Sequence, residues 1–215
     1  KIGTKFEFDS TDFEKVLFDS SLAKQYGFTD ETFMCMFIPN TYRVQWNTSA
    51  DELMARMAKE YKSFWTEERK QKARNIGLSQ SEVSTLASIV QKETASVGER
   101  PMVAGLYLNR LRDKWPLQAD PTIIFALKRN LGQETVIKRV LTKDLEIDSP
   151  YNTYKNRGLP PGPIAMPDIT SIDAVLNPTN HNYYYMCASV TKIGTHEFAK
   201  TLSQHNKNAF KYQVW

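Results

Sequence analysis

The chain has 215 residues, a length that fits one large domain or one domain with a small appendage. Hydrophobic residues make up 41% and charged residues 24%, which excludes a disordered chain. The longest unbroken apolar run, Met34 to Ile38, is far shorter than the ~20 residues of a membrane helix. The net charge is +4 and the basic residues are scattered, so we expect no nucleic-acid binding.

The N-terminal part combines short helical patterns with one apolar run. The pattern predicts helices over Thr11–Phe18 and Ser20–Tyr26, followed by the apolar run that ends at Pro39-Asn40. Helices this short are not stable alone. We therefore interpret residues 1–45 as the end of a small accessory domain, and residues 46–215 as the main domain. No secretory leader opens the chain, and its first residues are typical of a position inside a longer protein, so an anchor upstream stays open.

A long helical pattern opens the main domain. Ser49 and Glu52 have the spacing of a capping box. The apolar residues that follow recur every three or four positions, as the buried stripe of a helix does. They are Leu53, Met57, Tyr61, Phe64 and Trp65. The sequence predicts that this helix runs on until Gly77 stops it.

The next predicted helix carries a carboxylate on its apolar face. Ser79 and Glu82 form a second capping-box pair, and the stripe that follows is made of Val83, Leu86, Ala87 and Val90. At about 100° per residue, Glu93 falls between the directions of Leu86 and Ile89. Apolar neighbours and the negative end of the helix both disfavour the charged form of Glu93, so its pKa is expected to rise. A raised pKa suits a general acid. On periodicity alone, however, a buried ion pair with Arg100 or Arg110 is the more common explanation of such a pattern.

The remaining pattern is a mixture of helices, loops and two strands. Further helices are expected over 101–110, over 120–127 with Asp120 as N-cap and Pro121 as first helical residue, and over 202–212. Proline-rich loops fill 149–154 and 158–163, and strands are expected over 183–190 and 195–199. Helices with a small antiparallel sheet make this an α+β fold, mainly helical.

Several familiar kinds of enzyme site are missing from the sequence. It has no nucleophile elbow, no phosphate-binding loop and no paired-histidine zinc helix. The spacing of His181, His196 and His205 matches no metal pattern, so we expect no metal and no cofactor. Carboxylate chemistry remains, with Glu93 as the first candidate and Asp120 as a second whose role as a helix cap is an adequate alternative.

A collinear series of motifs resembles the MltG (YceG-like) endolytic murein transglycosylase family. The matching segments, in chain order, are Pro39–Tyr42, Leu86–Thr94, Glu99–Pro101, Asn109–Leu111, Pro116–Thr122, Tyr151–Tyr154, Gly158–Ile164, Asn177-Pro178, His196–Phe198 and His205-Asn206. So many motifs in register are far more specific than any one of them. The catalytic glutamate of the family corresponds to Glu93. Many members have glutamate where this chain has Gln91, which leaves Glu93 as the only acid of its motif.

The resemblance implies a bacterial envelope enzyme on the periplasmic face of the inner membrane. One membrane helix upstream would anchor it, and residues 1–45 would be the C-terminal part of a LysM-like subdomain. The substrate would be the peptidoglycan glycan strand, cut internally between MurNAc and GlcNAc. The sugar's own C6 hydroxyl would attack, leaving a 1,6-anhydro end, and Glu93 would serve as acid and then as base. Peptidoglycan synthases of elongation or division are expected partners.

Supporting roles are expected for six other residues. Hydrogen bonds to sugar hydroxyls and N-acetyl groups are predicted for Gln118, Asn152, Tyr154 and Asn206, ring stacking for Tyr151, and charge stabilisation for Asp120. The proline-rich segment 158–163 is expected to form a wall of the cleft. Two alternatives stay open: a muramidase-type hydrolase in which Asp120 activates water, and a wall-binding scaffold without catalysis.

Overall fold

The computed structural model describes residues 6–214 and confirms a mainly helical α+β fold. The elements, in chain order, are α1 (Ser10–Leu17), α2 (Ser20–Gln25), η1 (Phe33–Met36), α3 (Ala50–Phe64), α4 (Glu67–Asn75), α5 (Gln80–Glu93), η2 (Val97–Glu99), α6 (Arg100–Arg112), α7 (Asp120–Leu131), η3 (Thr142–Glu146), α8 (Ile169–Leu176), β1 (Tyr185–Ala188), β2 (His196–Ala199) and α9 (Leu202–Val214). None of the helices described here has the length and apolar character needed to cross a membrane.

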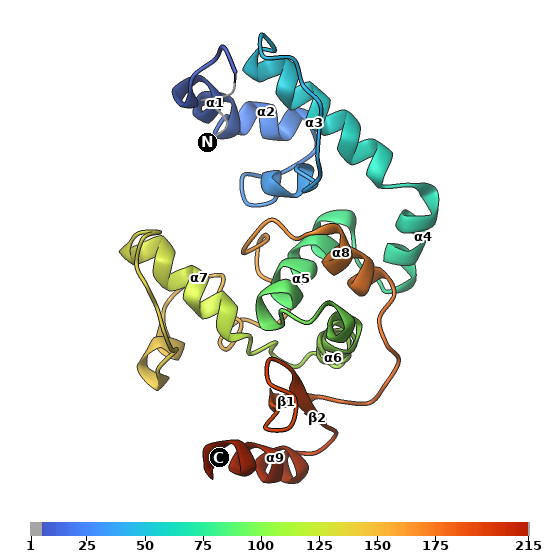
Figure 1. Cartoon of the computed structure of the whole chain (residues 1–215), viewed down its shortest axis with the longest axis vertical. Helices are drawn as coiled ribbons and strands as arrows, with labels where there is room; N and C mark the ends of the chain where they lie inside the picture. The colour runs from blue at the N-terminus through green and yellow to red at the C-terminus, as the bar shows by residue number, and fades with distance from the viewer. Residues whose placement is uncertain (1–5, 215) are drawn as a thin grey trace.

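The N-terminal elements form one end of the molecule, the upper end in Figure 1. The two short helices expected here are present as α1 and α2, and aspartates cap both of them. They share a hydrophobic core with η1 and with the apolar face of α3, which begins after the predicted boundary at residue 45. Its largest members are Phe8, Phe28, Phe33, Met36, Leu53, Met54 and Met57. The assignment of residues 1–45 to a LysM-like subdomain stays a prediction.

The prediction of one long helix from residue 48 to residue 77 is wrong, because the helix is interrupted at Trp65 and a second helix follows. The Ser49–Glu52 capping box is present and starts α3, which ends at Phe64. Trp65 leaves the helix and is 1% exposed, in the core of the central part rather than in that of the N-terminal part. The Thr66 side chain then accepts a hydrogen bond from the backbone of Arg69 and starts α4. The helix is therefore interrupted because Trp65 is buried in the core of the central part.

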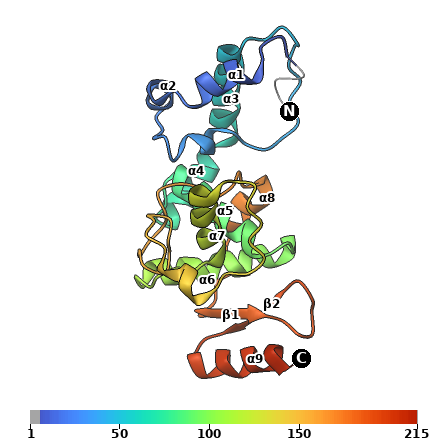
Figure 2. The same cartoon turned by 90° about the vertical axis from the view of Figure 1, so that its left-hand side faces the viewer.

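Helix α5 lies at the centre of the molecule. It packs against α6, α7 and α8, as Figures 1 and 2 show from two directions. All eight residues from Val83 to Val90 are buried, so this helix has no solvent face over two turns. The Ser79–Glu82 capping box is present at its start, and it ends at Glu93. The core fixes the position of this helix and hence the place of its last residue.

The C-terminal elements close the other end of the molecule. Strands β1 and β2 pair antiparallel, with Met186 opposite Phe198 and Ala188 opposite His196. Both lie within the predicted strands, and α9 packs against the pair. In Figure 2 this unit lies below α6, at the end of the molecule opposite the N-terminal elements.

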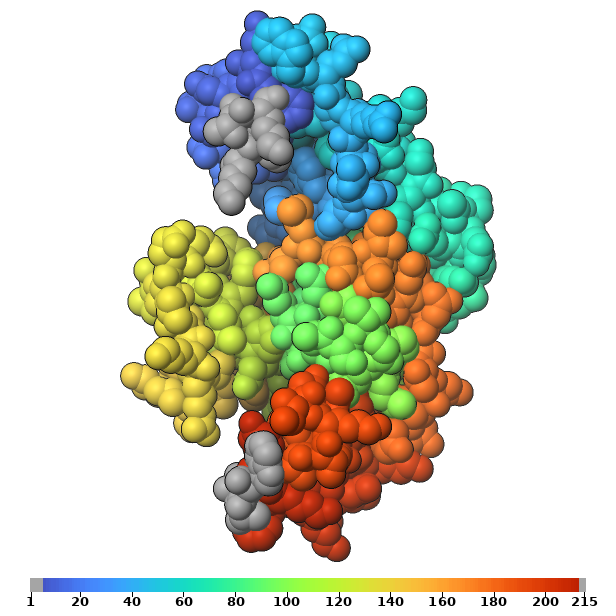
Figure 3. All heavy atoms as spheres, in the orientation of Figure 1, coloured from blue at the N-terminus to red at the C-terminus, as the bar shows by residue number. Residues whose placement is uncertain are grey.

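Two details of the remaining structure differ from the sequence prediction. Helix α8 was not predicted; Asp168 caps it by accepting a hydrogen bond from Ser171 N. Asp120 was predicted as the N-cap of α7, but the cap position is held by Ala119, and Asp120 is the first helical residue. Its carboxylate is therefore free for other partners. In Figure 3 the segment around residues 125–150, in yellow, projects from the body and leaves a recess beside the N-terminal part.

Candidate active site

Glu93 is the last residue of α5, where the helix meets α6. Its side chain keeps some access to solvent, but protein atoms surround it closely enough to desolvate the carboxyl group. The hydroxyl of Tyr107 donates a hydrogen bond of 2.6 Å to Glu93 Oε1. Tyr107 lies on α6 and is 1% exposed, so its position is fixed by core packing. A buried phenol that donates to a carboxyl group is the central contact of this site.

The surroundings of Glu93 raise its pKa from the ordinary value of 4.5 to about 7. Burial is the largest cause, because it disfavours the charged form. The Tyr107 hydrogen bond and the charges of His196 and Arg110 act in the opposite direction, whereas the charge of Asp120 adds to the rise. A carboxyl group with this pKa is divided between its acid and its base form near neutral pH.

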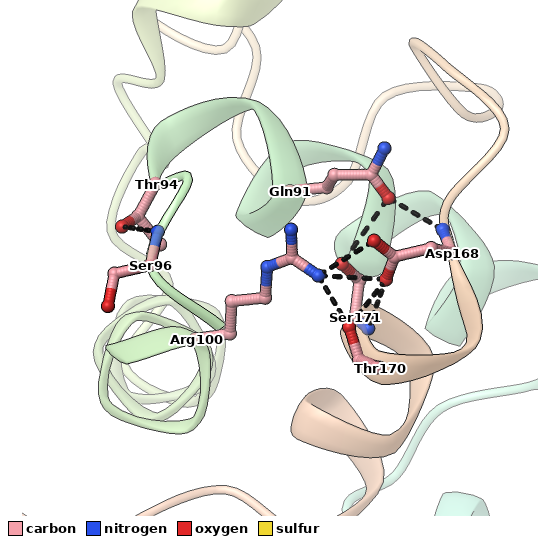
Figure 4. A network of polar contacts seen from close by, with 7 residues as sticks. All are labelled: Gln91, Thr94, Ser96, Arg100, Asp168, Thr170 and Ser171. Atoms are coloured by element: carbon pink, nitrogen blue, oxygen red, sulfur yellow. Dashed lines mark hydrogen bonds and ion pairs between the residues drawn. The ribbon is translucent and has the colours of Figure 1, made fainter. Parts of the chain in front are cut away.

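Neither arginine considered in the ion-pair alternative pairs with Glu93. Arg100 turns to α8, where its guanidinium donates to both oxygens of Asp168 at 2.8 Å and to Thr170 at 2.6 Å. Figure 4 shows this network. Arg110 donates instead to backbone carbonyls, at 2.5 Å to Leu117 and at 2.6 and 2.8 Å to Tyr184. Within residues 6–214, Glu93 has no ion-pair partner, so the ion-pair interpretation is wrong.

Gln91 belongs to the same network as Arg100 and links α5 to α8. Its Oε1 accepts hydrogen bonds from Asp168 N at 2.6 Å and from Ser171 Oγ at 3.3 Å (Figure 4). A side-chain oxygen is what this position requires, and glutamine supplies it without adding a charge beside Asp168.

Three of the predicted site residues lie together at the start of α7. The Tyr154 hydroxyl donates to Asp120 Oδ1 at 2.5 Å. The segment is fixed to the 151–154 loop, because Gln118 N donates to Thr153 O and Ala119 N to Thr153 Oγ1, at 3.1 and 3.0 Å. Gln118 and Asp120 are exposed, and Gln118 has a left-handed φ of 48°. The charge of Asp120 contributes to the raised pKa of Glu93, which makes this segment a candidate for one side of the site.

Tyr151 and Asn152 are structural, which corrects their predicted contacts with sugar. Tyr151 is 3% exposed, and its ring packs on Phe125 with Arg129 over it. No ring face is left for a ligand. The Asn152 side chain is fully buried; it donates to the carbonyls of Leu145 and Ile147 and accepts from the backbone of Tyr154. Its hydrogen-bonding groups are used in shaping the loop.

Two other predicted features lie in hollows that do not include Glu93. Asn206 is exposed on α9, in a shallow hollow with Leu202, Ser203, Lys207 and Phe210. The proline-rich residues 158–161 line a cavity of about 920 Å³ together with α6 and residues 178–181. The proline-rich segment lines this cavity, and its expected part in the cleft around Glu93 stays a prediction.

Sequence reasoning missed Tyr107 and the pair formed by Glu99 and His196. Tyr107 lies fourteen residues after Glu93, and only the packing of α6 on α5 brings the two side chains together. The sequence carries no local signal for this contact, because it depends on how the two helices pack. Glu99 and His196 both lie in motifs of the collinear series, but their contact spans 97 residues.

Comparison with known proteins shows the family of the chain. A family model described as the YceG-like family matches residues 4–211, almost the whole chain. The chain belongs to the YceG-like family. It is 40% identical over 166 residues to an endolytic murein transglycosylase of Bacillus subtilis, which covers 77% of this chain and 44% of that protein. It is 34% identical over 178 residues to the endolytic murein transglycosylase of Streptococcus pneumoniae strain D39, which covers 81% and 31%.

The fold of this YceG-like chain also has a solved counterpart. A crystal structure of a yceG-like protein from Listeria monocytogenes superposes with a TM-score of 0.75 and 31% identity, covering 94% of this chain and 67% of that one. The chain spans less than half the length of the two curated relatives that it matches. The family assignment thus rests on both sequence and fold.

Proposed function

We propose that this chain carries the active site of an endolytic peptidoglycan lytic transglycosylase. Its substrate would be the glycan strand, cut within the strand between MurNAc and GlcNAc, and its product a 1,6-anhydro-MurNAc end. The names of the two relatives support the reaction class. The observation that carries the proposal is the pKa of Glu93, raised to about 7 in a position where a neutral phenol, not an arginine, is its hydrogen-bond partner.

In the first step, Glu93 acts as general acid. Its protonated carboxyl group donates the proton to the glycosidic oxygen as the bond from that oxygen to C1 of MurNAc breaks. The GlcNAc side leaves with a hydroxyl group, and positive charge develops on the MurNAc ring. The Glu93 carboxylate that results is stabilised by the hydrogen bond from Tyr107, whose burial raises its own pKa and keeps it a neutral donor.

In the second step, the same carboxylate acts as base. It takes the proton of the C6 hydroxyl while that oxygen forms a bond to C1, which closes the 1,6-anhydro ring. Glu93 returns to its acid form, and no water is consumed. One carboxyl group is sufficient because the nucleophile belongs to the substrate, so a rigid site that holds the ring gains its rate from proximity.

The segment of Gln118, Asp120 and Tyr154 would contact the sugar on one side of Glu93. Both exposed side chains of this segment can offer hydrogen bonds to a glycan. Asp120 would stabilise the positive charge at C1 electrostatically, since its carboxylate already influences Glu93. Asn206, exposed on α9, would serve a more distant sugar.

The test is the substitution Glu93→Gln, which keeps the shape of the side chain and removes the proton. Purified glycan strands are digested, and the products are analysed by mass. We expect the wild-type chain to release anhydro-ended fragments and Glu93→Gln to release at least about 100-fold less. Glu134→Gln is the matched control, because Glu134 is exposed on the loop after α7. Undiminished release by Glu93→Gln would overturn the proposal.

The same digestion separates the alternatives. Reducing ends in place of anhydro ends would identify a hydrolase, in which Asp120 is the second carboxylate, and Asp120→Asn would then abolish release. Binding of strands without any cleavage would identify a scaffold.

The cellular setting forms part of the proposal. The enzyme would lie in the bacterial cell envelope on the periplasmic face of the inner membrane, held by a single helix upstream of the chain. There it would end or trim nascent strands beside the peptidoglycan synthases of elongation or division. Co-purification of the full-length protein with a synthase tests this partner directly.

A further inference from the structure

The end of α6 holds Trp115 in a fixed position at the surface. Its backbone N donates to Arg110 O at 2.8 Å, and Lys114 N donates to Leu111 O at 3.2 Å. These two hydrogen bonds form a Schellman motif, in which one residue of positive φ ends the helix. Glycine usually occupies that place, but here it is Lys114, with a φ of 56°. The indole that follows is 40% exposed, so a strained turn presents a large ring to solvent.

Two half-buried tyrosines support the Trp115 ring. The ring centroid of Tyr184 lies 5.2 Å from that of Trp115, and the centroid of Tyr185 lies 5.8 Å from it. Tyr185 begins β1 and is itself stacked on His205 of α9, at 5.5 Å. Trp115, Tyr184 and Tyr185 therefore form one continuous surface, the aromatic platform, whose shape is fixed by the packing of the C-terminal elements.

Hydrogen-bonding groups lie at the edge of the aromatic platform. The guanidinium of Arg112 donates to the Tyr184 hydroxyl at 3.0 Å and to Asp113 Oδ1 at 2.9 Å, and both charged residues are exposed. Their opposite charges are paired, so the edge is polar without a net charge. A pyranose ring has C–H groups on its faces and hydroxyls around its edge, which matches an aromatic ring with hydrogen-bonding groups beside it. An uncharged sugar is the chemical class that this surface fits.

Arg110 connects the platform to the candidate active site. It follows Tyr107, which donates to Glu93 Oε1, by about one turn of α6. Its buried guanidinium donates to Leu117 O at 2.5 Å and to Tyr184 O at 2.6 and 2.8 Å. One side chain thus fixes both the backbone of the platform and the segment that leads into α7. A strand bound at Glu93 can therefore continue along the end of α6 to the platform.

We propose that the aromatic platform is a glycan-binding subsite, in which Trp115 stacks on a sugar ring of the strand beyond the two sugars that flank the cut. This inference rests on the proposed function, because its occupant is the glycan strand. Trp115 takes no part in breaking the bond. Its contact is the same in the ground state and in the transition state, so it contributes to affinity for the strand and not to kcat.

The test is the affinity for purified, uncross-linked glycan strands that carry a fluorescent label at the reducing end. Binding is measured on the Glu93→Gln chain, with and without Trp115→Ala. We expect Trp115→Ala to raise Kd about tenfold through the loss of ring stacking. With Glu93 in place, the same substitution should raise KM by the same factor and leave kcat unchanged, which a general distortion of the active site would not do.

Two further variants separate stacking from packing. Trp115→Phe keeps a ring and should bind strands within about threefold of the parent, whereas Trp115→Leu keeps an apolar side chain without a ring and should bind as weakly as Trp115→Ala. Ile193→Ala is the control, because Ile193 is 84% exposed in the turn between β1 and β2. All variants are first compared by thermal unfolding, and Trp115→Leu carries the test if Trp115→Ala does not fold.

Three outcomes would overturn the inference. They are an unchanged Kd in Trp115→Leu and Trp115→Ala, an equal loss in Ile193→Ala, and a loss in Trp115→Phe as large as that in Trp115→Ala. An unchanged Kd together with an inactive Glu93→Gln would remove the subsite and leave the proposed function intact. A tenfold loss of affinity together with a Glu93→Gln chain that still cuts strands would support the subsite and remove the proposed role of Glu93.

Discussion

Glu93 and Tyr107 together determine how the site handles a proton. Burial favours the neutral acid, and the phenol hydrogen bond favours the carboxylate, so the two effects place the pKa of Glu93 between those of a surface carboxyl and a fully desolvated one. The sequence alone predicted the first effect from the apolar face of the helix. It could not predict the second, because Tyr107 comes from another helix.

The raised pKa of Glu93 makes a prediction about stability. The group gives its full stabilising contribution below pH 4.5, its ordinary pKa, and loses it as the pH rises through about 7. Glutamine cannot ionise. Relative to Glu93→Gln, the wild-type chain should therefore lose about 2 kcal/mol of unfolding free energy between pH 5 and pH 8. Urea unfolding of both proteins at pH 5, 6.5 and 8 measures this; parallel pH dependences would contradict it.

At the scale of the element, local capping signals located helix starts well and helix ends poorly. The Ser49–Glu52 and Ser79–Glu82 boxes both start helices, as predicted. The interruption at Trp65 was not predicted, because this residue continues the spacing of the apolar residues before it and such a spacing predicts a continuous helix. Thr66 followed by two acidic residues was the missed start signal. Helix α8 was not predicted, because its eight residues form only about two turns close to a proline-rich segment.

Gly162 provides a test of how the proline-rich segment packs on the N-terminal part. A Cβ atom at this position would lie 2.1 Å from the backbone oxygen of Glu31, so one of the two backbones must move. Gly162→Ala should lower the melting temperature by about 5 °C, which corresponds to about 2 kcal/mol for a chain of this size.

Gly98→Ala is the matched control for this measurement. A Cβ atom at Gly98 would meet no other atom within 4 Å, and the residue has no positive φ, so alanine should be tolerated there. Equal melting temperatures for the two variants would contradict the close contact between Gly162 and Glu31.

At the scale of the whole molecule, two hydrophobic cores organise the chain. One joins the N-terminal elements to α3, and the other surrounds α5. The α+β class and most element positions could be predicted, because they depend on local periodicity. The site could be predicted only in part: Asp120 and Tyr154 are hydrogen-bonded to each other, whereas Tyr151 and Asn152 are buried, where Tyr151 packs on Phe125 and Asn152 donates to backbone carbonyls.

The shared core predicts that α3 depends on the residues before it. Leu53, Met54 and Met57 are at most 7% exposed because Phe28 and Phe33, with their neighbours, cover them. A fragment of residues 46–215 would expose this apolar face. We expect it to bind a hydrophobic dye and to melt at least about 5 °C below the whole chain. A fragment as stable as the whole chain would show that α3 packs independently.

The central claim is that Glu93 stays protonated into the neutral pH range in the folded protein. The most direct measurement is a carbon-13 NMR titration of the glutamate side-chain carboxyl groups in the whole chain, with the Glu93 signal assigned by its loss in Glu93→Gln. We predict a midpoint near pH 7 for this signal. A midpoint near the ordinary value of 4.5 would contradict the account.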